Sequence, residues 1–360
     1  MEKFFIETEE VGELSAQLLR DSCTCLECRD VLSGQRLKSI VDLDPDLEIE
    51  EIEEDEDSVT FVLSDGHHVN LDSETVGDLL LEMIPLNWRS QSAKIMWDEQ
   101  SAPRATFLWS SVSSDDSILY EMLDQVISSG FAVISELPKK DRAVLDLIHT
   151  FGFERVTNYG DIFDVRVENE ANNLAFTNLP IAPHTDNPYR DPVPTIQLLH
   201  CLETNVEGGH SGLVDGFRAA VLLRESDPES FEILTTHLFQ FEYKNPETHL
   251  STLAPIIKLD AMEEIVEIRW NDRSMQPPFS GFDIDEVYHA LRSFARILNA
   301  PINMYGFKLE PGQCMIFDNT RILHARTGFE SEGKRHLQGA YADLDSAISK
   351  WSILQDKLNV

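Results

Sequence analysis

The chain has 360 residues, of which 42% are hydrophobic, and this allows one large globular domain with a smaller one attached. Its 64 acidic residues outnumber 29 basic ones, for a formal net charge of -35, which argues against nucleic-acid binding because that affinity depends on basic residues that displace phosphate counterions. No apolar run approaches the ~20 residues that span a bilayer, and the N-terminus lacks the pattern of a secretory signal, so we expect a cytoplasmic protein without a membrane partner.

Three of the five cysteines lie close together near the N-terminus. Cys23, Cys25 and Cys28 form a C-x-C-x-x-C pattern, and in a reducing compartment such a cluster favours metal binding over disulfides. A closed site of four thiolate and imidazole ligands is typical of structural Zn(II). Either His67 or His68 could supply the fourth ligand.

The next elements predict a small β-rich domain. The acidic run 42–57 contains hydrophobic residues that are too regularly spaced for a disordered segment. In SVTFVLSDGHHVNL, β-branched and aromatic residues flank Asp65-Gly66, which is a strong signal for a hairpin turn. A helix is expected over Thr75–Ile84, and the polar, proline-containing stretch 86–105 is typical of a linker. The sequence therefore predicts domains at 1–100 and 101–360.

The second domain is predicted to be mainly β. DDSILYEMLDQVISSG indicates a helix that ends at Gly130, FAVISEL a buried strand, and DRAVLDLIHTFGF another helix. Few helices are expected among the strand-like runs that follow: TIQLLHC, GLVDGF, EIVEIRW and QCMIFD. We predict an α+β fold, mainly β, in which a double-stranded β-helix of the jelly-roll type has helical buttresses and follows the small zinc-binding domain.

Two distant segments carry candidate metal ligands. His184 and Asp186 are separated by one residue, so in an extended segment both point to one side. His324, far downstream, could add a second imidazole. Two histidines and one carboxylate on one face of an ion, with the opposite face open, are typical of non-haem iron(II) oxygenases. Arg335 could bind the distal carboxylate of a cosubstrate, because guanidinium matches carboxylate in a bidentate geometry.

Taken together, these motifs resemble those of the γ-butyrobetaine dioxygenase family, within the broader group of taurine dioxygenase-like enzymes. The resemblance covers both predicted domains, and the stretches that carry it are LLRDSCTCLEC, HTDNPYRDPVPTIQLLHC, GGHSGLVDGF, PGQCMIFDNTRILHAR and RHLQGAYADLD.

The resemblance implies an enzyme that hydroxylates a small molecule with oxygen. It implies Fe(II), held by His184, Asp186 and His324, 2-oxoglutarate as cosubstrate and ascorbate as reductant. Arg335 and Ser211 would bind the distal carboxylate of 2-oxoglutarate. It also favours His67 over His68 as the last ligand of a structural Zn(II), and it implies a homodimer.

Selectivity for a trimethylammonium group is expected to come from aromatic faces, because the group forms no strong hydrogen bond. By resemblance, Tyr159, Phe163, Phe176 and Tyr341 occupy positions of cage aromatics, although Phe163 stands where tryptophan is expected and Phe176 where tyrosine is expected. Tyr189 lies in the same region of the sequence. Further candidates are polar: Asn173 beside the cage, and Asn271 for the substrate's carboxylate.

Hydroxylation of γ-butyrobetaine to carnitine is the first expectation for the reaction. Arg190 and Arg273 lie near the site in sequence, and if both reach the pocket, 2-(trimethylamino)ethylphosphonate is the alternative substrate. A sulfonate or a trimethyllysine-like substrate is a third possibility. A non-catalytic binding protein on the same fold is the remaining alternative, and the presence of all three metal ligands argues against it.

Overall fold

The computed structural model describes residues 14–80, 94–166, 177–278, 283–330 and 333–358. The chain divides into two compact units, residues 1–91 and 92–360, and each is described by itself. Among the described helices, none combines the length and the apolar character needed to cross a bilayer.

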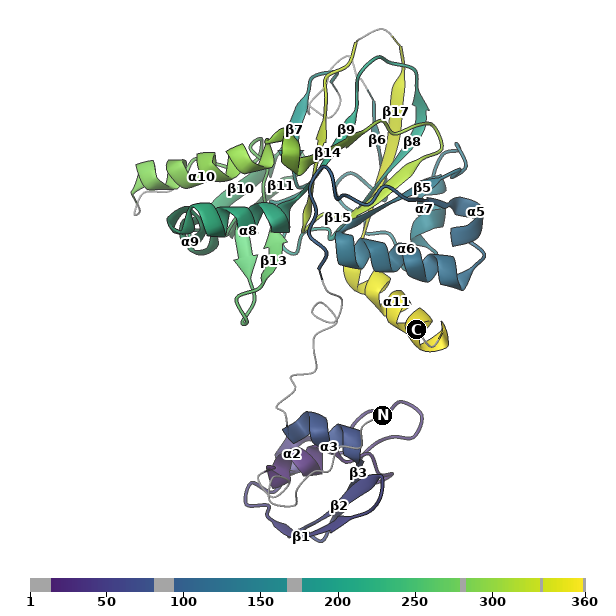
Figure 1. Cartoon of the computed structure of the whole chain (residues 1–360), viewed down its shortest axis with the longest axis vertical. Helices are drawn as coiled ribbons and strands as arrows, with labels where there is room; N and C mark the ends of the chain where they lie inside the picture. The colour runs from purple at the N-terminus through teal and green to yellow at the C-terminus, as the bar shows by residue number, and fades with distance from the viewer. Residues whose placement is uncertain (1–13, 81–93, 167–176, 279–282, 331–332, 359–360) are drawn as a thin grey trace. The chain divides into compact units, whose positions relative to one another are not determined.

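The first unit is a three-stranded antiparallel sheet, in the order β1-β2-β3, with short helices (Figure 1). The predicted hairpin is confirmed: β2 and β3 pair around Gly66, whose φ of +77° favours glycine. The predicted helix begins at Ser73, and its residues beyond Leu80 lie outside the described ranges. The bounds are α2 Ala16–Ser22, η1 Ile40–Asp42, β1 Ile49–Glu54, β2 Ser58–Leu63, β3 His68–Asp72 and α3 Ser73–Leu80.

The second unit contains two larger sheets. One is ordered β4-β5-β15-β8-β17-β6 and the other β14-β9-β16-β7. Their strands are β4 Thr106–Leu108, β5 Phe131–Ser135, β6 Ile162–Val165, β7 Ile181–His184, β8 Ile196–Thr204, β9 Ser211–Asp215, β14 Met304–Phe307, β15 Cys314–Asp318, β16 Ile322–Arg326 and β17 Arg335–Ala342. Two hairpins add β10 Phe239–Lys244, β11 His249–Ala254, β12 Ile257–Leu259 and β13 Ile265–Ile268.

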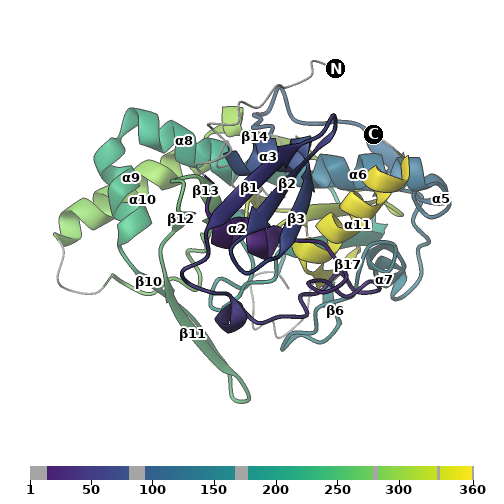
Figure 2. The same cartoon turned by 90° about the horizontal axis from the view of Figure 1, so that it is seen from below.

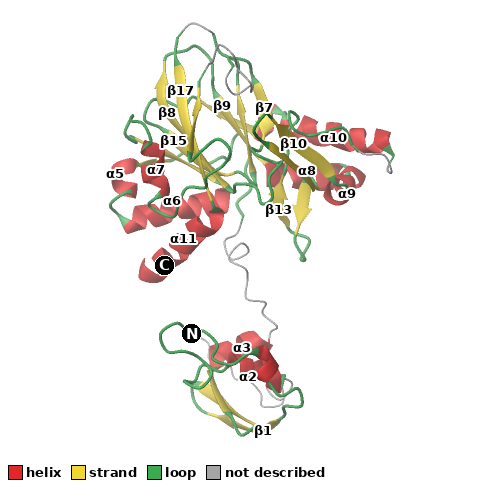
Figure 3. Ribbon diagram, turned by 180° about the vertical axis from the view of Figure 1, so that it is seen from behind, coloured by secondary structure: helices red, strands yellow, loops and turns green. Residues whose placement is uncertain are grey.

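Helices gather on two sides of these sheets, as Figures 1 and 3 show. One group is α5 Trp109–Val112, α6 Asp116–Ser129, α7 Ala143–Ile148 and α11 Leu344–Leu358; the other is α8 Gly216–Ser226, α9 Pro228–Thr236 and α10 Ile284–Leu298, followed by η3 Pro301–Asn303. The expected helix before Gly130 is confirmed, and Gly130 ends it in the left-handed conformation. The expectation of few helices between the strands is wrong, because α8, α9 and α10 all precede β14. Together with strands such as β10 and β13 they pack around one hydrophobic core, called here the helical core.

The β10–β11 hairpin is anchored by that helical core. Phe239 and Phe241 on β10 are completely buried in it. Figure 2 shows the hairpin extending outward from the helices of this group. Because side chains alternate along a strand, Tyr243 continues the face that carries the two phenylalanines. Its ring lies beyond the core and faces the cavity described below.

Strand β8 contains a completely buried histidine, His200. Burial lowers its pKa to about 4, whereas in the unfolded chain the value is near 6.5. The unfolded state therefore binds more protons, so this contribution to stability is complete above about pH 6.5 and is lost as the pH falls toward 4.

Loss of this contribution should lower the free energy of unfolding of the second unit in the wild type between pH 7 and pH 5. In His200→Leu the decrease over the same range should be about 2 kcal/mol smaller. Urea unfolding at both pH values measures this difference. His149→Leu, at a more exposed histidine, is the control. Equal decreases in His200→Leu and wild type would contradict the assignment.

Candidate active site

The three candidate metal ligands of the second unit meet at the edge of the smaller sheet. His184 ends β7, His324 lies on β16, and the two residues are paired directly across the ladder. Their ring centroids are 4.1 Å apart. Asp186, two residues beyond His184, places Oδ1 3.4 Å from His184 Nε2. One donor atom from each residue lies within 4.8 Å of the others, which brings together the predicted triad.

Neighbouring groups fix the orientation of these side chains. His184 Nδ1 lies 2.9 Å from the Ala182 carbonyl, so this nitrogen carries the proton and Nε2 is left for a metal. Gln197 and Tyr341 both donate to Asp186 Oδ2, over 2.8 and 3.0 Å. This leaves Oδ1 as the oxygen that faces the histidines.

The backbone around Asp186 is held by the loop between β15 and β16. Asn319 accepts a hydrogen bond from the Asp186 amide over 2.8 Å and donates to the Asp186 carbonyl over 3.0 Å. On the other side, Thr185 and Trp270 exchange backbone and hydroxyl hydrogen bonds. The loop is therefore rigid before any metal binds.

The protonation states suit metal binding at neutral pH. Burial, with a smaller effect of the neighbouring His184, lowers the pKa of His324 to about 3, so its imidazole is neutral. Burial opposes ionisation of Asp186, but its close contact with His184, with smaller effects of His324 and Arg273, outweighs burial and holds its pKa well below the usual range. Two imidazoles and one carboxylate form a donor set that fits a divalent transition metal.

The triad opens into a cavity of about 440 Å³. Among the described residues that were predicted to form the site, Tyr159, Phe163, Tyr189, Ser211, Asn271, Arg273, Arg335 and Tyr341 line it. Arg190 does not, and it donates instead to Asn158. Asn173 and Phe176 lie outside the described residues. The cavity is also lined by residues that sequence reasoning missed: Gln197, Glu242, Tyr243, Lys244 and Arg326.

Arg335 and Ser211 offer a site for an anion. Arg335 is 9% exposed, and it forms no ion pair with a carboxylate among the described residues. Gly209 makes room for it, because a Cβ there would lie 3.2 Å from Arg335 Cδ and Nε. Ser211 is 3% exposed and pairs with Arg326 across β9 and β16. A buried guanidinium without a protein carboxylate fits a ligand carboxylate.

Five aromatic rings form one continuous surface, the aromatic wall: Tyr159, Phe163, Tyr189, Tyr243 and Tyr341. Phe163 stacks on Tyr341 with centroids 5.1 Å apart, and Tyr189 stacks on Tyr243 at the same spacing. Tyr159 lies 6.2 Å from Phe163 and 5.9 Å from Tyr243, and so joins the two pairs. Burial raises the pKa of Tyr159 to about 12, so the hydroxyl is not ionised at neutral pH.

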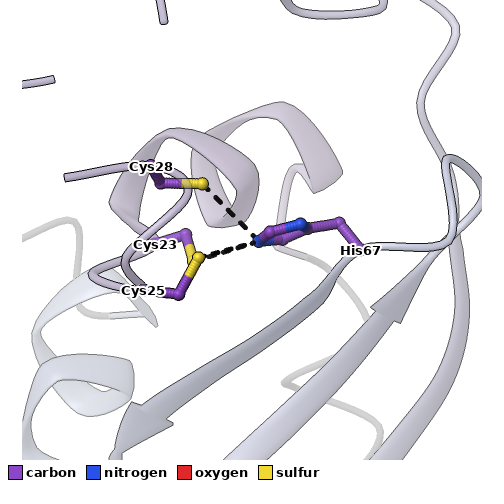
Figure 4. A group of neighbouring side chains, drawn as sticks. All are labelled: Cys23, Cys25, Cys28 and His67. Atoms are coloured by element: carbon purple, nitrogen blue, oxygen red, sulfur yellow. Dashed lines mark hydrogen bonds between the residues drawn. The ribbon is translucent and has the colours of Figure 1, made fainter. Parts of the chain in front are cut away.

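A second donor cluster lies in the first unit. The sulfur atoms of Cys23, Cys25 and Cys28 point toward the ring of His67 (Figure 4), at 3.2, 3.6 and 3.6 Å from its Nε2. In a tetrahedral site with Zn–S and Zn–N bonds of about 2.3 and 2.0 Å, sulfur and nitrogen are about 3.5 Å apart. The cluster therefore has the dimensions of a closed zinc site, and His67 is the histidine that meets the cysteines.

Arg20 and Asp65 support this cluster from outside. Arg20 donates to Cys28 Sγ over 2.8 Å and to Asp65 Oδ2 over 3.0 Å. Asp65 Oδ1 in turn accepts from the backbone amide of His67 over 3.0 Å. The three residues connect the cysteine loop to the β2–β3 turn.

Comparisons with known proteins cover both units. Residues 97–341 match the family described as taurine catabolism dioxygenase TauD, TfdA family, and residues 6–71 match the family described as gamma-butyrobetaine hydroxylase-like, N-terminal. The chain is 30% identical to the gamma-butyrobetaine dioxygenase of Pseudomonas sp. (strain AK-1), over 94% of this chain and 89% of that protein. It is 28% identical to the trimethyllysine dioxygenase of Meyerozyma guilliermondii, over 93% and 89%.

Solved structures show the same fold at lower identity. An asparagine oxygenase in complex with Fe(II), hydroxyasparagine and succinate aligns with a TM-score of 0.51 and 16% identity, covering 67% of this chain and 94% of that one. The PvcB protein of Pseudomonas aeruginosa aligns with a TM-score of 0.50 and 21% identity, covering 69% and 89%.

Proposed function

Because the chain belongs to the TauD/TfdA family of iron- and 2-oxoglutarate-dependent dioxygenases, we propose that it hydroxylates a small trimethylammonium substrate, with γ-butyrobetaine as the first choice and carnitine as its product. The observation that carries the proposal is the aromatic wall, which lies in the same cavity as the metal triad. Two relatives support it, because they are named as dioxygenases of γ-butyrobetaine and of trimethyllysine, which both carry a trimethylammonium group.

In this proposal His184, Asp186 and His324 hold Fe(II), and Arg335 and Ser211 bind the distal carboxylate of 2-oxoglutarate. Bound together, iron and 2-oxoglutarate supply the oxidising chemistry, in which one oxygen atom of O₂ enters a C–H bond of the substrate and the other enters succinate as CO₂ leaves. The protein side chains orient the cosubstrate, place the substrate carbon and exclude water.

The aromatic wall provides the binding site for the trimethylammonium group. A fixed positive charge is attracted to each ring face that it meets, by roughly 0.5 to 2 kcal/mol per ring. Asn271 and Arg273, which also line the cavity, would hold the anionic end of the substrate. The carboxamide of Asn271 is pre-oriented, since it donates to the Thr185 carbonyl over 3.1 Å and accepts from the Arg273 amide over 3.1 Å.

2-(Trimethylamino)ethylphosphonate is the second candidate substrate. Besides Arg326 and Arg335, the cavity is lined by the cationic residues Lys244 and Arg273, and two cations suit a dianion better than a carboxylate. Arg190, the other arginine expected to favour phosphonate, turns to Asn158 instead. We therefore keep the carboxylate substrate first.

The proposal also covers the fold, the zinc site, the oligomeric state and the cellular compartment. The two large sheets support a double-stranded β-helix of the jelly-roll type for residues 101–360. The donor distances around His67 support structural Zn(II) in residues 1–100. We also propose a cytoplasmic homodimer, and the five free cysteines fit a reducing compartment.

The test is succinate release by the purified protein with Fe(II), ascorbate, 2-oxoglutarate and O₂. γ-Butyrobetaine, the trimethylammonium phosphonate, trimethyllysine and taurine are compared. Turnover that is fastest with γ-butyrobetaine supports the first choice, and preference for the phosphonate supports the second. Turnover of taurine alone would contradict the trimethylammonium proposal, and binding without turnover of any substrate would indicate a non-catalytic protein.

Arg335 tests the cosubstrate site separately. We expect Arg335→Leu to raise the KM for 2-oxoglutarate about 100-fold, because the ligand carboxylate would lose its buried partner. Arg335→Lys keeps the charge but loses the planar fork, so a rise of about tenfold is expected. Arg104→Leu, at an exposed arginine, should change nothing. A KM for 2-oxoglutarate that stays within twofold of wild type in Arg335→Leu would place the cosubstrate elsewhere.

A further inference from the structure

We propose that Tyr341 is a positioning residue that couples occupation of the substrate cavity to the carboxylate ligand Asp186. The juxtaposition is direct: the ring of Tyr341 is part of the aromatic wall, while its hydroxyl donates to Asp186 Oδ2 over 3.0 Å. The substrate part of this inference rests on the proposed function, but the effect on the metal ligand does not.

The first step concerns how Asp186 is fixed. Its Oδ1 faces His184 Nε2, and its Oδ2 accepts hydrogen bonds from Gln197 and Tyr341. These two donors hold Oδ2 away from the metal position, so the carboxylate presents one oxygen. Hydrogen bonds to metal-ligating groups typically change metal affinity by 10- to 100-fold.

The second step distinguishes the two donors. Gln197 reaches Asp186 from β8. It pairs with Tyr341 across the ladder and lines the cavity, but it contributes no ring to the aromatic wall. Tyr341 is 3% exposed, and its ring stacks on Phe163 with an interplanar angle of 26°. Since the hydroxyl is attached rigidly to the ring, any displacement of the ring changes the hydrogen bond to Asp186.

Phe163 lies against one face of the Tyr341 ring. Phe163 lies over Gly339, which faces it across β6 and β17. A Cβ at Gly339 would lie 2.3 Å from Phe163 Cζ, so the glycine lets the Phe163 ring lie against the strand backbone. Phe163 therefore supports one face of Tyr341. A cation bound at the wall contacts the same tyrosine whose hydroxyl holds the metal ligand.

The consequence is that substrate alters the metal environment without touching the metal. A ligand can shift an equilibrium only through a contact that differs between two states. Here that contact is the face of Tyr341, and the two states differ in the hydrogen bond to Asp186 Oδ2. Cosubstrate turnover would therefore depend on an occupied cavity, which limits oxidation of 2-oxoglutarate without substrate.

The experiment uses the full-length protein loaded with Co(II), whose visible absorption reports the coordination of the ion. The variants are Tyr341→Phe, which keeps the ring and removes the hydroxyl, and Gln197→Met, which removes the other hydrogen bond and leaves the wall intact. For each we would measure the Kd of Co(II), the Kd of γ-butyrobetaine by calorimetry with 2-oxoglutarate present, and the absorption change on adding γ-butyrobetaine. Work under argon prevents turnover, and thermal unfolding checks the fold.

We expect both variants to weaken Co(II) binding about tenfold. In Tyr341→Phe the Kd of γ-butyrobetaine should stay within threefold of wild type, but the absorption change that γ-butyrobetaine causes should be lost. Gln197→Met should keep this absorption change. A change that persists in Tyr341→Phe, or that disappears equally in Gln197→Met, overturns the coupling. If no trimethylammonium compound binds the wild type, the proposed function fails, and the Co(II) affinity then decides: an unchanged Kd in Tyr341→Phe overturns the positioning role as well.

Discussion

Replacing Asp186 with alanine should lower succinate release by at least about 1,000-fold and reduce iron binding to a small fraction of one equivalent. Asp186 supplies the one carboxylate of the triad, and its pKa is held well below the usual range, so it is ionised at neutral pH. Without it, two imidazoles remain, which is too few ligands to hold a labile divalent ion against solvent. Turnover and metal content of the purified variant measure the two effects.

The matched control for this experiment is Asp146→Ala. Asp146 is an exposed carboxylate on α7 that pairs with Lys140 and lies outside the cavity. Its replacement should leave iron content unchanged and turnover within twofold of wild type. Iron bound stoichiometrically by Asp186→Ala, with turnover within tenfold of wild type, would mean that the reactive metal is held elsewhere.

Replacing Cys28 with serine should remove zinc from the first unit and destabilise its sheet. The described core of this unit is small, and Cys23 and Cys28 are part of it, together with Phe61 and Val69. Units of this size rarely fold stably without disulfides or a metal, and zinc binding supplies folding free energy directly. We expect zinc content to fall below about 0.1 equivalent and amide protection in β2 and β3 to fall by about 100-fold or more.

Hydrogen exchange and elemental analysis of the full-length chain measure this result. Cys314→Ala is the control, because Cys314 is also buried but lies in the second unit, outside the cluster. It should retain full zinc and full protection of β2 and β3. If Cys28→Ser keeps its protection after losing zinc, the ion is not what stabilises this sheet.

The parts of the fold that follow from local chemistry could be predicted. The Asp65-Gly66 turn, the helix that ends at Gly130 and the strand after it are each set by a glycine conformation or a short apolar run, and all three are confirmed. The helix predicted from DRAVLDLIHTFGF is shorter, covering Ala143–Ile148; its start is set by Arg142, which has a φ of +66°.

The missed helices had a signal in the sequence. Asp215, Asp227 and Asp283 each cap a helix by accepting backbone hydrogen bonds, and Pro228 follows one of them. This N-terminal pattern predicts helix starts. The packing of α8, α9 and α10 around one shared core is a tertiary feature that local sequence does not show.

Some features of the candidate site could likewise be predicted from local sequence, and others depend on tertiary packing. His184 and Asp186 are close in sequence, so their shared direction could be predicted. Gln197 is a buried polar residue in β8, which could have indicated a buried partner, but nothing local identifies that partner as Asp186. Tyr243 reaches the aromatic wall only because the β10–β11 hairpin is anchored in the helical core. Such contacts depend on tertiary packing and could not be predicted from local sequence.

The pairing of His184 with His324 has a consequence for the order of folding. The two strands that carry them are far apart in the chain, so their pairing is a non-local contact, for which the entropy of closing a long loop must be overcome. A slip of one residue would turn His324 to the other side of the sheet. We therefore expect the proposed iron site to be completed late in folding, so that metal incorporation reports correct strand alignment.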